Sequence, residues 1–140
     1  VYGGASRETA ATDAAVRATK GQYVSYQGAP AMTQFSSSSG GRTSAGSQPY
    51  LVAADDPYDG WAGNANHAWT VSVPASRIQK AYPAIGTLRS LTVTRRTGGG
   101  DWGGRVATVT LTGSARSVTI SGNDARWAFG LKSNWFSFGS

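Results

Sequence analysis

Apolar and polar residues alternate along several short stretches of the chain. This period of two is typical of β-strands that bury one face, and the later stretches are rich in Val, Thr and Ile, which favour strands. Turn residues separate neighbouring stretches, notably at 28–30 and in the glycine-rich segment 97–104. We therefore expect antiparallel strands joined by hairpins, over residues 22–28, 31–35, 68–73, 90–96, 105–113 and 116–121.

Three other stretches favour short helices, over residues 9–21, 74–82 and 121–130. The first is rich in alanine, with Thr12 as its candidate N-cap and Gly21 as its stop. The second opens on a proline, which suits the start of a helix. The third has Ser121 as candidate cap, Asp124 in its first turn and Gly130 at its end. The pattern as a whole predicts a single α+β domain, mainly antiparallel sheet with two or three short helices.

Residues 44–66 show neither the alternation of a strand nor the pattern of a helix, and Gly, Pro, Asp and Asn are crowded there. We expect a long ordered loop rather than a linker. The reason is that four apolar side chains offer it something to bury, namely Tyr50, Leu51, Val52 and Trp61.

The composition narrows the classes of function. The chain has 140 residues and no cysteine, which excludes disulfides and thiolate chemistry. It has no apolar run long enough to span a membrane. The net charge is +6, but the basic residues are scattered and only Arg95 and Arg96 are adjacent. This favours an anionic cell-wall surface over nucleic acid as partner.

Few side chains are candidates for acid–base catalysis. Glu8 lies near a predicted helix start, where interaction with the helix dipole or solvent is its favoured role. His67, the only histidine, precedes a predicted strand, and a surface or hydrogen-bonded role is favoured over that of a base or metal ligand. Three carboxylates crowd residues 55–60, but their spacing is not that of a calcium loop, and Pro57 favours turns.

Two glycine-containing loops are candidate binding elements. The hairpin end 97–104 carries Trp102, which either stacks on a sugar ring or folds back on the sheet. The segment 34–43 runs through four serines, two glycines and Arg42. Hydroxyls, backbone N–H groups and a guanidinium fork suit a polar or anionic ligand, but a structural turn in which Arg42 pairs with an internal Asp is an equal alternative.

Several segments, in order along nearly the whole chain, resemble the SpoIID/LytB domain family, which comprises stage II sporulation protein D and the amidase enhancer LytB. The most specific blocks are SSGGRT at 38–43 and the PYL…DDP block at 49–57. The blocks that carry the resemblance are Tyr2-Gly3-Gly4, 15–43, 49–59, Trp69 and 128–136.

The resemblance implies an extracytoplasmic protein of peptidoglycan remodelling. One branch of the family is similar to a lytic transglycosylase, which cuts between N-acetylmuramic acid and N-acetylglucosamine. The other is described as enhancing N-acetylmuramoyl-L-alanine amidases. A noncatalytic module that binds wall carbohydrate is a further alternative. The implied partners are glycan strands and an amidase, with no cofactor. The implied ligand-binding residues are Ser36, Ser37, Ser38, Ser39, Gly40, Gly41, Arg42, Thr43, Tyr50 and Trp69; Tyr50 and Trp69 are alternatively core residues.

Two departures from the family pattern matter. The family's catalytic glutamate belongs to a helical segment that precedes the Tyr2-Gly3-Gly4 motif, so the 140 residues resemble the C-terminal portion of the domain. We therefore expect this chain to contribute glycan contacts but no catalytic residue. Some members also bind a metal through a Cys and a His in the loop that corresponds to 35–41, where this chain has serines, so no metal is expected there.

Overall fold

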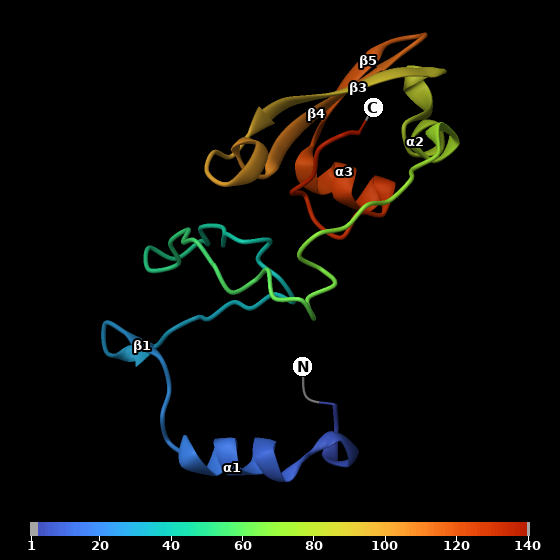
Figure 1. Cartoon of the computed structure of the whole chain (residues 1–140). Coiled ribbons are helices and arrows are strands. Elements are labelled where there is room, and N and C mark those ends of the chain that lie inside the picture. Colours follow the sequence, from blue (N-terminus) through green and yellow to red (C-terminus); the bar gives the residue numbers. More distant parts are fainter. Residues whose placement is uncertain (1–2, 140) are drawn as a thin grey trace. The chain divides into compact units, whose positions relative to one another are not determined.

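The protein is described by a computed structural model that covers residues 3–139 (Figure 1). The predicted α+β class is confirmed, with short helices and antiparallel sheets. Tertiary contacts separate two compact units that meet in sequence between Phe35 and Ser36. No helix within residues 3–139 is long and apolar enough to cross a bilayer.

The second unit contains the main sheet, whose strands lie in the order β3-β4-β5 with antiparallel pairing. All three strands were predicted from the alternating pattern, and so was the glycine-rich hairpin end between β3 and β4. Apolar residues form rows across the sheet, as in the row of Val93, Val109 and Ile120. The strands are β3 (Leu88–Arg96), β4 (Val106–Gly113) and β5 (Ser117–Ser121).

Helix α3 (Gly122–Phe129) lies against this sheet and closes the core (Figure 1). Ala125 and Phe129, one turn apart, are both buried and define its inner face. The predicted caps are confirmed: Ser121 Oγ accepts a hydrogen bond from Asp124 N at 3.0 Å, and Gly130 ends the helix in the left-handed region. Ile78 of helix α2 (Ala75–Ala81) and Ile85 of the 3₁₀ turn Pro83–Ile85 complete the core.

The first unit contains helix α1 (Ala10–Ala18) and a small hairpin. The predicted cap was wrong by one turn: Thr9 caps α1, and Thr12 supports it as the third residue of a capping box. Each threonine can accept from the other's backbone N–H, so two threonines three residues apart give no sequence signal for which one begins the helix. A 3₁₀ turn, Ala5–Arg7, precedes α1.

The strands predicted at 22–28 and 31–35 are much shorter in the structure. Only β1 (Ser25–Tyr26) and β2 (Ala29–Pro30) pair, and residues 31–35 form no strand. The turn is centred on Gln27 and Gly28, whose φ angles are 51° and 79°. It therefore begins earlier than the predicted turn at 28–30, and the short ladder ends at Pro30.

The strand predicted at 68–73 is absent. Trp69 and Val73 still pack against the core, while Val71 between them is exposed. The alternating pattern thus reflects burial of single side chains. A strand also requires a neighbour to pair with, and none of the described residues pairs with this segment.

Residues 44–66 are irregular, as predicted, with one isolated bridge between Arg42 and Asp55 at their base. The prediction that four apolar side chains anchor this loop by burial was partly wrong. Val52 and Trp61 are 66% and 67% exposed, although Tyr50 and Leu51 are half-buried. Hydrogen bonds donated to carboxylates, described below, supply the order that apolar burial was expected to give.

Candidate functional site

The serine–glycine loop (residues 36–41) folds around the carboxylate of Asp59. Ser38 Oγ donates to both carboxylate oxygens, at 2.9 and 2.8 Å. The backbone N–H groups of Ser39 and Gly40 donate to it as well, at 2.7 and 3.0 Å. The Asp59 side chain is only 4% exposed, so its charge is balanced by these donors rather than by water.

His67 completes the shell of donors around Asp59. Its Nδ1 lies 2.6 Å from Asp59 Oδ2, and its side chain is 39% exposed. Burial acts to raise the pKa of Asp59, but the hydrogen bonds from His67, Ser38 and the backbone of Ser39 and Gly40 outweigh it and hold that pKa well below its ordinary value. Asp59 is therefore an ionised carboxylate at neutral pH.

Asp56 of the 55–60 cluster also organises a turn, as predicted, whereas Asp55 pairs with Arg42. Asp56 accepts a hydrogen bond from Ser39 Oγ at 2.9 Å and another from Tyr58 N at 3.2 Å. Asn64 Nδ2 donates to Asp59 O at 2.7 Å and ties the next turn to the cluster. In the part of the chain that the structure describes, no group of three or more acidic or histidine side chains could hold a metal ion.

The two glycines of the loop are required by its geometry. Gly40 and Gly41 have φ angles of 74° and 97°, in the region that favours glycine. A side chain at Gly40 would also meet the ring of Trp135, since an added Cβ would lie 3.1 Å from Trp135 Cε3. The indole of Trp135 therefore packs directly on the loop backbone.

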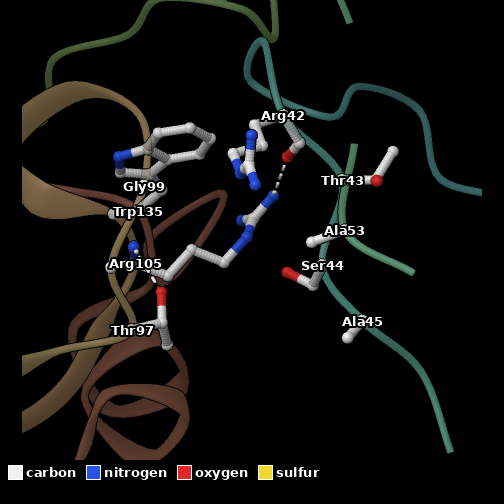
Figure 2. Close-up of a pocket in the computed structure, with 11 residues that line it drawn as sticks. Arg42, Thr43, Ser44, Ala45, Ala53, Thr97, Gly99, Arg105 and Trp135 are labelled. Atoms are coloured by element: carbon white, nitrogen blue, oxygen red, sulfur yellow. Dashed lines mark hydrogen bonds between the residues drawn. The ribbon is translucent and has the colours of Figure 1, made fainter. Parts of the chain in front are cut away.

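A cleft of about 430 Å³ opens beside this loop (Figure 2). One wall is the segment 42–45 with Ala53, and the other is the hairpin end with Arg105 and Trp135. The lining combines hydroxyls, backbone amides and two guanidinium groups with about as much apolar surface. The lining residues are Arg42, Thr43, Ser44, Ala45, Ala53, Thr97, Gly98, Gly99, Gly104, Arg105 and Trp135.

Arg105 links the two walls. Its Nη2 donates to the backbone oxygens of Ser39 and Arg42, at 2.7 and 3.3 Å, and Figure 2 shows its side chain reaching toward Arg42. Its Nη1 donates to Ser133 Oγ at 3.0 Å, and the guanidinium lies 5.0 Å from the centre of the Trp135 ring. Burial, and then the positive charge of Arg126, lower the pKa of Arg105.

The charge of Arg105 has no carboxylate counterpart among the described residues, because each oxygen that accepts from its guanidinium is neutral. Arg42 differs, since its Nη1 pairs with Asp55. The alternative in which Arg42 pairs with an internal Asp is thus observed. Arg42 nevertheless lines the cleft, so the cleft holds two guanidinium groups, of which that of Arg42 is paired with a carboxylate outside the lining.

The structure brings together part of the predicted set of site residues. Ser38, Ser39 and Gly40 donate hydrogen bonds to Asp59, and Gly41 N donates to Ser39 Oγ. Arg42 and Thr43 line the cleft. The others lie outside it: Ser36 and Ser37 are exposed, Tyr50 is half-buried and is not part of the lining, and Trp69 packs against the core.

Four residues of the site were not predicted as binding residues: Asp59, His67, Arg105 and Trp135. Asp59 and His67 each stood out as titratable residues, but only the fold shows that they pair. Nothing in the spacing of Arg105 and Trp135 distinguishes them from other basic or aromatic residues.

Trp102, on the 3₁₀ turn Asp101–Gly103, is 60% exposed. The indole is therefore largely exposed to solvent rather than folded back on the sheet. A second hollow, of about 890 Å³, runs along α1 in the first unit and is lined by Gly3, Gly4, Arg7, Glu8, Thr12, Asp13, Val16 and Arg17. None of the predicted ligand-binding residues lies there.

Comparisons with protein-family models, with curated proteins and with solved structures found no match to this chain.

Proposed function

We propose that this chain binds the glycan strands of bacterial peptidoglycan in the cleft between residues 42–45 and the 97–104 hairpin, as an extracytoplasmic module of cell-wall remodelling. The observation that carries the proposal is the lining of the cleft. It combines hydroxyls, glycine backbone and an indole with two guanidinium groups. Sugars require many hydrogen-bonding groups and an aromatic surface, and the carboxylate of muramic acid requires a cation.

The charge balance of the cleft supports an anionic glycan over a neutral one. Arg105 is half-buried with neutral acceptors, and Asp55 offsets only Arg42. A bound carboxylate would compensate the remaining positive charge in surroundings that screen it less than bulk water does. The resemblance to the SpoIID/LytB family supports the same ligand independently, and it is why we place the protein in peptidoglycan remodelling.

The binding experiment compares two glycans and two variants. Peptide-stripped glycan strands carry muramic carboxylates, whereas chitin oligosaccharides are neutral. We expect the strands to bind more tightly than chitin. Arg42→Ala should weaken strand binding by about tenfold, the usual effect of losing one charge-assisted hydrogen bond. Isothermal titration calorimetry at fixed salt would measure the affinity of the wild-type chain and of the variant for each glycan.

Arg89→Ala is the matched control, because Arg89 is an exposed residue of β3 outside the cleft and its loss changes the net charge equally. Equal weakening by both variants would show that binding follows net charge alone, and would overturn the proposal for this cleft. Tight binding of chitin with none of the muramic strands would instead indicate a general carbohydrate-binding module.

A further inference from the structure

We propose that the outward face of the β3-β4-β5 sheet binds an anionic phosphodiester polymer of polyols, of the poly(glycerol phosphate) kind. Helices α2 and α3 contribute to the core on the other side of this sheet (Figure 1). None of the outward residues named below lines the cleft, so the inference does not depend on the proposed function.

The register of the sheet places hydroxyl side chains in rows across all three strands. Leu91, Leu111 and Val118 form one row that packs against the core. Side chains alternate along a strand, so the rows on either side of this one point outward. Every residue in these two outward rows is a serine or a threonine. The rows are Ser90-Thr112-Ser117 and Thr92-Thr110-Thr119, and together with Thr94 and Thr108 they are called the hydroxyl face.

Most of these hydroxyls are free to bind a ligand. Those of Ser90, Thr92, Thr112 and Ser117 form no hydrogen bond to any described residue, and three of these four side chains are exposed. Hydroxyls that already pair within the sheet keep some capacity. Thr110 Oγ1 and Thr119 Oγ1 lie 2.9 Å apart, and because only one of them donates to the other, the second proton remains available to an outside acceptor.

The charge at the ends of the hydroxyl face has one sign. Arg95 is paired in register with Thr108 at one end, and Arg116 directly precedes Ser117 at the other. Both arginines are exposed, and neither forms a salt bridge with a described residue. No acidic residue belongs to any of the three strands. The surface therefore presents unpaired cations and hydroxyl donors together, which suits an anion with many oxygen atoms.

A phosphodiester matches these donors. Arginine forks and serine or threonine hydroxyls are among the side chains that hydrogen-bond phosphate oxygens in proteins. A polyol chain adds its own hydroxyls between the phosphates, which can pair with the rows of threonines between the two arginines. The strands are anchored by the buried core, so these donors are held in fixed positions before a ligand arrives.

Nucleic acid fits this face less well, although it is also a phosphodiester polymer. The outward positions have no aromatic side chain, and proteins that bind single strands stack the bases on aromatic rings. Short serine and threonine side chains on a sheet also offer no element that could enter a groove of the duplex. A polymer without bases is therefore the favoured partner.

Strand preference alone does not explain this surface. Threonine is common in strands, which accounts for its presence on an exposed face. An ordinary solvent-exposed face also mixes charges of both signs, which keeps it soluble and guards its edges. Here the outward positions of β4 from Thr108 onward, and those of β5, have no charged residue, and the charges of β3 are all positive.

The experiment measures binding of soluble poly(glycerol phosphate) to the 140-residue chain by isothermal titration calorimetry at fixed salt. Arg95→Ala and Arg116→Ala should each weaken binding by about three- to fivefold, as expected for a solvent-exposed ion pair. The double variant Thr92→Val/Thr112→Val should weaken it by about fivefold. Valine keeps the strand preference, and neither hydroxyl has a partner within the chain, so the midpoint of urea unfolding should not fall.

Lys80→Ala is the charge-matched control, because Lys80 is exposed on α2, which packs on the core side of the sheet. It should change the affinity by less than about twofold. Equal weakening by Lys80→Ala and Arg95→Ala would show that binding follows net charge, and would overturn the proposal. An unchanged affinity of the double threonine variant would also overturn it, because the hydroxyl rows would then take no part.

Two other polymers of equal total charge identify the class of ligand. Single-stranded DNA has phosphodiesters with bases, and polygalacturonate has carboxylates on a polyol chain. We expect both to bind at least about fivefold more weakly than poly(glycerol phosphate). Tighter binding of DNA would indicate a nucleic-acid surface, and tighter binding of polygalacturonate a carboxylate surface. Either result would overturn the assignment to a polyol phosphate, and so would absence of poly(glycerol phosphate) binding by the wild-type chain.

Discussion

At the scale of single residues, Asp59 organises a part of the chain that buries little apolar surface. Its carboxylate gathers donors from the serine–glycine loop on one side and His67 on the other. Because these donors stabilise the charged form more than burial opposes it, the pKa of Asp59 lies well below the ordinary range of a carboxyl group. The same bonds that shape the site therefore also contribute to stability.

This contribution depends on pH with a defined sign. A carboxyl group whose pKa is lowered by folding stabilises the fold above its unfolded pKa, near 3.9, and that stabilisation is lost as pH falls through the lower folded value. We expect Asp59→Asn to reduce the free energy of unfolding at neutral pH by about 2 kcal/mol. The difference between wild type and variant should shrink below about pH 4.

Urea unfolding from pH 7 down to pH 2.5 would measure the pH dependence of Asp59→Asn. Asp101→Asn is the control, because Asp101 is exposed and its side chain has no hydrogen bond to any described residue. A constant difference between wild type and Asp59→Asn across this range would contradict the lowered pKa of Asp59.

At the scale of elements, the start of α3 is fixed by its contact with β4. Gly122, the first residue of the helix, is buried where its backbone passes the carbonyl of Val106. A Cβ added there would lie 1.8 Å from Val106 O. The neighbouring atoms are backbone, so neither element can yield without losing the register between helix and sheet.

We therefore expect Gly122→Ala to lower the free energy of unfolding by about 2–3 kcal/mol or more, as overpacking of a core does. The sign of this change in unfolding free energy is informative, because alanine is the better helix former by about 1 kcal/mol and would stabilise an isolated helix. Thermal unfolding followed by circular dichroism would measure the change. Gly139→Ala, where an added Cβ meets nothing within 4 Å, should have little effect. A variant at Gly122 as stable as the wild type would show that α3 does not rest on Val106.

At the scale of the whole molecule, the hydrophobic core belongs to the second unit. Its buried members all lie between Ile78 and Phe136, whereas none of residues 3–35 is buried. Helix α1 is held by its capping box, and the β1-β2 hairpin by a few backbone bonds. Burial of apolar surface dominates stability, so the two units should contribute to it very unequally.

A fragment of residues 36–140 should therefore fold cooperatively, with a free energy of unfolding within about 1 kcal/mol of that of the full chain, because it retains the whole core. Chemical denaturation of both chains would test this, and amide NMR spectra would show whether the resonances of β3, β4, β5 and α3 coincide. A fragment without a cooperative transition would show that residues before 36 contribute to the core.

Local patterns determined much of the second unit. The alternation in β3, β4 and β5 was sufficient because adjacent strands in a hairpin find their partners within a few residues. The serine cap and left-handed glycine of α3 are likewise local devices. In contrast, the segment 68–73 alternates as clearly but forms no strand, since pairing depends on a neighbour that its own residues do not specify.

The sequence by itself determined the α+β class, the glycine-rich hairpin and a polar loop at 36–41. Only the tertiary structure decided what that loop surrounds and what faces it. Ser38 reaches Asp59 across 21 positions, and Arg105 reaches the backbone of Ser39 across 66. The physical reason is one of range: a residue's own neighbours decide caps, turns and strand periodicity. A buried carboxylate, in contrast, takes its donors from whatever the packing of distant segments brings within about 3 Å of it.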